Sequence, residues 1–198
     1  MPTPMKFVGG LPCLDFVNTV GSWVSGRVVD DKIESYSDLI RWAELAGLAI
    51  VGSPRPDRRR ASKVLARSRA LRGALHRLLT SLLDHRNPSS ADLAIIGAEL
   101  RLARTHEVLT TQRGKFLWTF DHPHALDSVL WQVSQSAADL LTSTDLARVR
   151  RCAGENCGWM FLDTTRNHSR HWCDMQDCGN RAKVRRFRAR QAQAHPPR

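Results

Sequence analysis

Residues 151–190 read RCAGENCGWMFLDTTRNHSRHWCDMQDCGNRAKVRRFRAR and contain four of the five cysteines of the chain. The cysteines form two pairs, Cys152 with Cys157 and Cys173 with Cys178, and each pair encloses four residues. Fifteen residues separate the pairs, enough to bring four sulfur atoms around one tetrahedral ion. The spacing therefore predicts a structural Zn²⁺ site with four thiolate ligands. Two alternatives stay open, an iron–sulfur cluster and replacement of one cysteine by His168 or His171.

The rest of this segment predicts a knuckle, a hairpin and a helix. Residues 159–163 have the composition of a strand and residues 164–170 that of a polar turn, so we expect a hairpin between the two cysteine pairs. Asp174 and Asp177 suit the N-terminal end of a helix that the second pair opens. On that helix Val184 and Phe187 share one narrow strip, which we expect to dock on the small zinc core.

Cations flank this strip on both sides: Arg181, Lys183, Arg185, Arg186, Arg188 and Arg190. Residues 150–198 hold eleven Lys or Arg and only four Asp or Glu, in a chain whose net charge is +11. Contact between such a helix and nucleic acid is favourable, because the cations displace condensed counterions from the phosphates. We therefore predict DNA binding by these six residues and Asn180, with Asn180, Arg181 and Arg185 as candidates for base-edge contacts.

Two other functions stay open. The protein could bind RNA, since Trp159, Phe161 and Trp172 could stack on unpaired bases. It could instead be a ligand-binding or interaction protein whose finger is a structural clip. A second basic concentration, at residues 58–77, reads as the solvated side of a helix or as a further nucleic-acid contact.

The finger segment resembles the CGNR zinc finger, named for the tetrapeptide found here at residues 178–181. The resemblance implies a zinc ion on the four paired cysteines and a DNA-binding role for the basic helix. Upstream, LDFVNTV (residues 14–20) and DLIRWAELAGL (residues 38–48) resemble the ABATE domain. That domain accompanies this finger in bacterial proteins described as stress-induced transcription regulators, which implies a bacterial regulator responding to stress.

The residues before the finger predict helices separated by one hairpin. Apolar spacing predicts helices after the caps Ser37 and Asn87 (or a neighbouring serine), over residues 64–83 behind a breaker-rich loop at residues 52–60, and over residues 126–141. Residues around Arg113 and Gly114 predict a two-stranded hairpin. The opening, residues 7–23, fits a strand and a helix equally well.

The resulting fold is mainly α with a small β element. We predict an ABATE-like helical domain for sensing or dimerisation at residues 1–147, a CGNR-type four-cysteine finger at residues 148–190 and a frayed tail at residues 191–198. A chain of 198 residues suits one sizeable core with a small satellite, so the metal would organise a finger too small for its own core. A homodimer fits this plan, because one finger makes few DNA contacts.

Location and chemistry follow from what the sequence contains. The N-terminus has only a short apolar run, broken by glycines and Pro12, so we expect a cytoplasmic protein with reduced cysteines and no membrane contact. Asp121, His122, His124 and Asp127 could bind a metal or move protons, but no catalytic motif accompanies them, so we predict no enzyme. Asp15 and Asn18 either tie backbone groups together or line a pocket for a small-molecule effector. Cys13 reads as core packing or as a reactive thiol.

Overall fold

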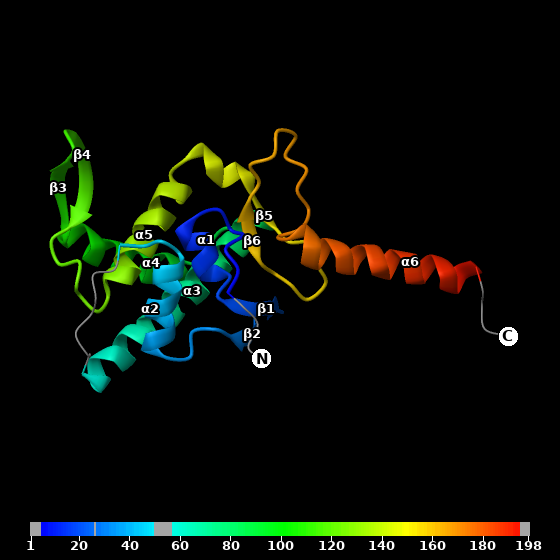
Figure 1. Ribbon diagram of the computed structural model, residues 1–198, viewed down its shortest axis with the longest axis horizontal. Coiled ribbons are helices and arrows are strands. Elements are labelled where there is room, and N and C mark those ends of the chain that lie inside the picture. The colour runs from blue at the N-terminus through cyan, green and yellow to red at the C-terminus, as the bar shows by residue number, and fades with distance from the viewer. Residues whose placement is uncertain (1–4, 26, 50–56, 195–198) are drawn as a thin grey trace.

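The computed structural model describes residues 5–25, 27–49 and 57–194 (Figure 1). Within these ranges the protein is mainly helical with small antiparallel two-stranded sheets, as predicted. The helices are α1 (Pro12–Val17), α2 (Tyr36–Leu45), α3 (Arg58–Leu83), α4 (Ser90–Thr105), α5 (Ser128–Leu141) and α6 (Asn180–Ala194), with single turns η1 (Thr144–Arg148) and η2 (Met175–Gly179). The strands pair as β1 (Val20–Val24) with β2 (Arg27–Asp31), β3 (Glu107–Gln112) with β4 (Lys115–Phe120), and β5 (Val149–Arg151) with β6 (Met160–Leu162).

The opening segment contains both structures that its pattern allowed, one after the other. Helix α1 starts at Pro12, whose fixed φ suits the first helical position, and buries Leu14, Phe16 and Val17. The chain then continues as strand β1. Because α1 packs against α3, α5 and β6, it lies at the centre of the core, which explains why its apolar residues face in more than one direction.

Side-chain caps set the starts of the next helices, not always where the sequence predicted. Ser35, not Ser37, caps α2 and forms a capping box with Asp38. Asp57 caps α3, so the helix begins at Arg58, inside the predicted loop at residues 52–60, of which 52–56 lie outside the described residues. Ser89 caps α4.

Helix α3 runs through the middle of the molecule (Figure 1). Four of its eight basic residues between positions 58 and 77 have partners within the protein. The guanidinium groups of four arginines donate to internal acceptors: Arg67 to Glu99 and Asp127, Arg69 to the carbonyls of Ile33 and Glu34, Arg72 to Asp31 and Thr19, and Arg77 to Asp92. Half of the eight cations at residues 58–77 thus stabilise the fold, whereas Arg58, Arg59 and Arg60 are exposed at the start of the helix.

The predicted hairpin at residues 107–120 is confirmed. Its turn residues Arg113 and Gly114 both have positive φ, at 51° and 76°, as a tight two-residue hairpin turn requires. The hairpin stands out from the body at the end opposite α6 (Figure 1). It leaves Leu109, Phe116 and Trp118 more than half exposed.

Strand β6 is a strand as predicted, but its partner is not the one expected. It pairs with β5, which precedes the first cysteine pair, so the hairpin encloses Cys152 and Cys157 and does not lie between the two pairs. Residues 163–174 are irregular. The core favours this pairing, because Val149 faces Leu162 across the ladder and both add apolar surface to the core.

The cysteine segment is not a satellite. Met160 and Phe161 are fully buried in the same core cluster as Leu14 and Leu71. Asn18 fastens β6 to this core, because its amide donates to the carbonyl of Met160 (2.7 Å) and accepts from the Met160 amide (2.9 Å). Residues 149–179, which we call the cysteine base, therefore fold as part of the N-terminal core.

Helix α6 has the opposite surroundings and extends away from the body into solvent (Figure 1). It continues to Ala194, past the predicted start of a frayed tail at residue 191, because Gln and Ala favour helix; residues 195–198 lie outside the described residues. None of the described helices is both long enough and apolar enough to span a membrane.

Candidate metal centre and nucleic-acid interface

The structure brings the four paired cysteines together. Their sulfur atoms all lie within 4.8 Å of one another, and all four residues are buried. The Sγ of Cys173 lies 3.8 Å from that of Cys157 and 3.7 Å from that of Cys178. A tetrahedral zinc ion with Zn–S bonds of about 2.3 Å separates its sulfurs by about 3.8 Å, so the cluster fits one such ion. An iron–sulfur cluster would need the sulfurs spread around a larger inorganic core.

The electrostatics of the cluster also fit a bound cation. The pKa of the Cys152 thiol is lowered to about 2, because the thiols of Cys157 and Cys173 and the amides of Cys173 and Gly154 donate to its sulfur. The pKa values of Cys157 and Cys173 are both raised, mainly through their contacts with the ionised Cys152 sulfur. One sulfur thus ionises readily and its neighbours resist, which is the repulsion that a divalent cation relieves.

Two glycines shape the turn of the first cysteine pair, Gly154 inside the pair and Gly158 directly after Cys157. A Cβ at Gly154 would lie 3.0 Å from the sulfur of Cys178 and 3.3 Å from that of Cys152, so only glycine lets the turn approach the cluster this closely. Gly158 has a positive φ of 68° and lies against Trp23. The sequence pattern did not single out Gly154, because its role depends on the second pair, far along the chain.

The surroundings of the cluster lead directly into α6. Arg181 donates to the sulfur of Cys178 (3.2 Å), which offsets negative charge on the thiolate. Asp174 caps η2, as expected for a carboxylate at a helix start, and also binds Lys6 (2.7 Å). The start of the basic helix is therefore tied to the metal-binding cluster on one side and to the N-terminal segment on the other.

Comparison with protein families agrees with this arrangement. The CGNR zinc finger model matches residues 148–191. The ABATE model, described as "putative stress-induced transcription regulator", matches residues 10–144. The chain belongs to the ABATE family. No curated protein matches it.

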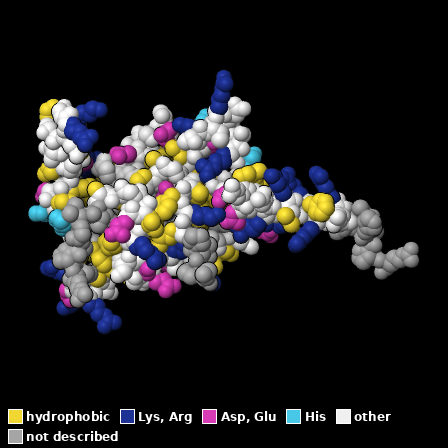
Figure 2. All heavy atoms as spheres, viewed as in Figure 1, with side chains coloured by type: hydrophobic (Ala, Val, Ile, Leu, Met, Phe, Trp, Pro, Cys, Tyr) yellow, Lys and Arg dark blue, Asp and Glu magenta, His cyan; other side chains and the backbone are white. Residues whose placement is uncertain are grey.

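The basic helix of this ABATE protein carries six cations, of which only two have an acidic partner among the described residues. All six predicted contact residues on α6 are exposed, and so is Asn180. Arg181 pairs with Asp177 (3.1 Å) and Arg185 with Glu155 (3.4 Å), both near the base. No described acidic side chain lies within ion-pair distance of the other four: Lys183, Arg186, Arg188 and Arg190. Figure 2 shows these cations spread along the projecting arm.

The predicted docking of α6 through its apolar strip is wrong. Val184 is 48% exposed and Phe187 61% exposed, whereas Ala182, in the first turn, is buried. The helix leaves the base in its first turn, so its later residues have no core to reach. The strip thus lies in solvent between the cations, available for a partner.

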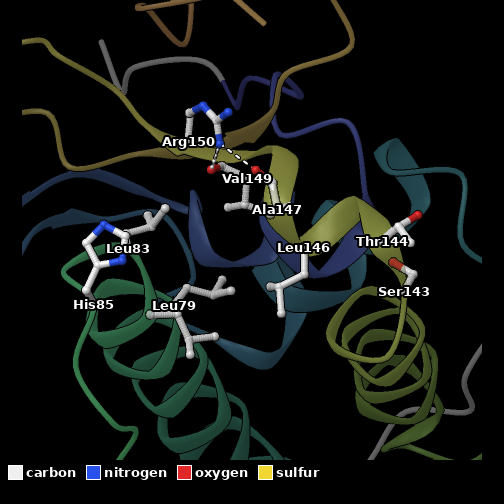
Figure 3. A pocket seen from close by; sticks show the side chains of 10 residues that line it. Leu79, Leu83, His85, Ser143, Thr144, Leu146, Ala147, Val149 and Arg150 are labelled. Carbon is white, nitrogen blue, oxygen red and sulfur yellow. Dashed lines mark hydrogen bonds between the residues drawn. The ribbon is translucent and has the colours of Figure 1, made fainter.

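The side chains of Asp15 and Asn18 form hydrogen bonds with backbone groups. Asp15 accepts a hydrogen bond from the Gly9 amide (2.7 Å), and burial raises its pKa to about 6. Asn18 holds both backbone groups of Met160, as described above. These contacts match the first role that the sequence allowed, tying backbone groups together. Neither residue lines the pocket drawn in Figure 3.

Other candidate residues have different surroundings from those predicted. His168 and His171 are exposed and lie outside the cysteine cluster. Asp121 and His122 lie near each other, but their third neighbour is His106, which shares a 3.0 Å hydrogen bond with Asp121 and stacks on Trp131. Asp127 instead binds Arg67. No local motif predicted His106 beside Asp121, because the β3–β4 hairpin separates the two residues in the sequence.

Cys13 and two of the finger aromatics are core residues. Burial raises the pKa of Cys13 to about 11, so its thiol stays protonated and unreactive near neutral pH. Trp159 is buried and donates to the carbonyl of Val20 (2.8 Å), and Phe161 is fully enclosed. Stacking by these two rings on RNA bases would require the core to open.

Proposed function

We propose that this protein is a zinc-dependent DNA-binding transcription regulator. In this proposal Cys152, Cys157, Cys173 and Cys178 hold the zinc ion, which supplies structural cross-linking and no chemistry at a substrate. The observation that carries the proposal is the projecting helix α6, anchored to the metal-binding cluster, on which four exposed cations have no ion pair among the described residues. Such an arm stabilises contact with a polyanion and has no role in the core.

The geometry suits a DNA groove. Fifteen helical residues span about 22 Å, and the major groove of B-DNA admits one α-helix. Lys183, Arg186, Arg188 and Arg190 would contact phosphates and set affinity. Three residues were predicted to contact nucleobase edges. Asn180 and Arg181 already form hydrogen bonds within the protein, to Gln176 and Cys178. Arg185, whose ion pair is exposed, is therefore the best placed of the three to contact a nucleobase.

The remaining parts of the proposal concern the whole protein. The ABATE domain would sense a ligand or dimerise, and the protein would act as a regulator in the bacterial cytoplasm. It would be a binding protein and not an enzyme. A two-fold symmetric DNA site would support dimerisation through this domain.

The first experiment selects bound sequences from a random duplex DNA pool, with a chelated sample beside the zinc-loaded protein. We expect a motif enriched only with zinc. Failure of the zinc-loaded protein to bind DNA would contradict the proposal and favour a finger that is only a structural clip.

A charge series tests the interface itself. Replacing Arg186, Arg188 and Arg190 by Gln should weaken binding and reduce the slope of log affinity against log salt by roughly 3 units, because three phosphate contacts are lost. The matched control replaces Arg58, Arg59 and Arg60, which are equally exposed at the start of α3. Equal losses in both triple variants would mean that only net charge matters and that α6 is not the interface.

RNA is the second candidate partner, and the buried Trp159 and Phe161 argue against it. Competition between duplex DNA and a structured RNA of equal length decides between them. We expect DNA to compete more strongly. Stronger competition by RNA would replace DNA as the proposed partner while leaving α6 as the contact surface.

A further inference from the structure

Two hollows lie beside α3 where the cysteine base joins the ABATE domain. The one in Figure 3, about 730 Å³, is lined by leucines of α3 and by Leu146 and Val149, and its Arg150 donates to the carbonyls of Ala147 and Val149. Nothing in its lining indicates an occupant. The second hollow, about 530 Å³, lies among α3, β1 and the first cysteine pair, and we call it the polar hollow because most of its lining residues are polar or charged.

The polar hollow contains buried groups without partners. His76 is only 5% exposed, and its ring stacks on Trp23 with centroids 3.7 Å apart. Neither Nδ1 of His76 nor Oγ1 of Thr80 has a hydrogen-bond partner among the described residues. The two side chains are one helical turn apart on α3, so they lie on the same side. Because buried polar groups are nearly always hydrogen-bonded, such a pair points to a partner outside the chain.

The charge of the hollow favours an anion. Three guanidinium groups line it, those of Arg77, Arg86 and Arg151. Two carboxylates oppose them: Asp92 binds Arg77, and Asp84 binds both Arg86 (2.9 Å) and Arg151 (2.8 Å). One positive charge is therefore in excess, and a guanidinium has five N–H donors, more than these ion pairs use.

The hollow also adjoins the metal-binding cluster. Arg151 immediately precedes Cys152, and Gly158 immediately follows Cys157. The amide of Trp23, in the wall of the hollow, donates to the carbonyl of Cys157 (2.9 Å). A molecule bound here would contact the ABATE domain and the first cysteine pair together.

We propose that this hollow binds a small anion with a carboxylate or phosphate group, held by Arg86 and Arg151 and by the free polar groups of His76 and Thr80. Binding would tighten the first cysteine pair and so slow the loss of its metal ion. The anion site does not depend on DNA binding by α6. The tightening rests on the proposed zinc site.

The test is titration of the zinc-loaded full chain, without DNA, by inorganic phosphate and separately by citrate at constant ionic strength, with the ring nitrogens of His76 followed by NMR. A saturable shift with one anion identifies the chemical class. We expect Thr80→Val and Arg151→Gln to weaken binding by about tenfold or more. Thr80→Val removes a hydroxyl that bonds nothing in the described structure, so it should leave the fold intact.

The control is Arg166→Gln, which removes the same charge from an exposed loop of the cysteine base and should bind the anion as the unaltered chain does. If neither anion produced a saturable shift, the proposed anion site would be wrong, and water would be the partner of these polar groups. Equal weakening in Arg166→Gln would also overturn it, since the response would then reflect general surface charge.

Zinc release to a chelator provides the second readout. With the binding anion present, we expect release to slow severalfold, and Thr80→Val should abolish the slowing. Anion binding without any change in the release rate would overturn the coupling to the cysteine pair. DNA affinity plays no part in either readout, so failure of this proposal and failure of the DNA-binding proposal are distinguishable.

Discussion

The two halves of the finger differ sharply in their surroundings. The cysteine base, residues 149–179, shares the core of the ABATE domain, and its Phe161 is fully buried. The basic helix that follows leaves Phe187 61% exposed, and its described ion pairs with the cysteine base end at Arg185, in its second turn. A short metal-binding segment can thus use a neighbouring domain as its core, which leaves the adjoining helix free to extend into solvent.

Metal removal should have the largest effect, since the cluster joins the two halves. In Cys173→Ser we expect loss of the bound ion and a fall in the free energy of unfolding on the order of 5 kcal/mol or more, because the buried site loses a ligand and its charge balance. Chemical denaturation with metal analysis measures both.

Cys13→Ser is the control for this change, because it should keep one zinc ion per chain. If Cys173→Ser retained the metal and full stability, the four-thiolate assignment would be wrong. Because β6 lies in the common core, we expect the loss to weaken the ABATE domain as well as the finger.

A pair of phenylalanine variants sharpens the comparison directly. Phe161→Ala should cost about 3–5 kcal/mol through lost burial and cavity formation, whereas Phe187→Ala should change stability by less than about 0.5 kcal/mol. Urea denaturation of both variants measures the difference. A large loss in Phe187→Ala would show that α6 packs on the body, against the exposure described here.

A pair of asparagines tests the fastening of the base. Asn18→Ala leaves both backbone groups of Met160 without partners in the core and should cost about 3 kcal/mol. Asn180→Ala loses one exposed bond to the carbonyl of Gln176 and should cost less than about 0.5 kcal/mol. Similar costs for the two variants, measured by thermal unfolding, would contradict separate environments for base and helix.

The smallest expected effect concerns pH. Burial, helped by the charges of Arg151 and Arg77, lowers the pKa of His76 to about 4 from its ordinary value near 6.5. As the pH falls below 6.5 the unfolded chain therefore takes up a proton that the folded chain refuses, and stability decreases until about pH 4. At pH 5.5 this contribution is about 1 kcal/mol relative to pH 8.

Replacing His76 by Gln should remove that contribution, so the difference between pH 8 and pH 5.5 should shrink by the same amount. His171→Gln, the same change at an exposed histidine in the cysteine base, is the matched control. Identical pH curves for His76→Gln and the unaltered chain would show that His76 takes up its proton as easily folded as unfolded.

Local signals predicted most of the elements. The β3–β4 hairpin follows from Arg113 and Gly114, and α4 from a serine cap, because turn and cap chemistry act over a few residues. The partner of β6 could not be found in this way. Its ladder depends on Val149, which the sequence separates from it by the first cysteine pair, and on the core that both strands join.

The candidate site also has features that local sequence signals predicted and features that they did not. The spacing of the cysteines predicted their clustering, because fifteen intervening residues suffice to bring two pairs around one ion, and the run of cations predicted a basic helix. Only the tertiary structure decided that Val184 and Phe187 face solvent, that Asn18 holds Met160, and that His76 and Thr80 meet Arg151 around one hollow. The physical reason is that burial and partnership depend on segments that meet only after the chain has folded.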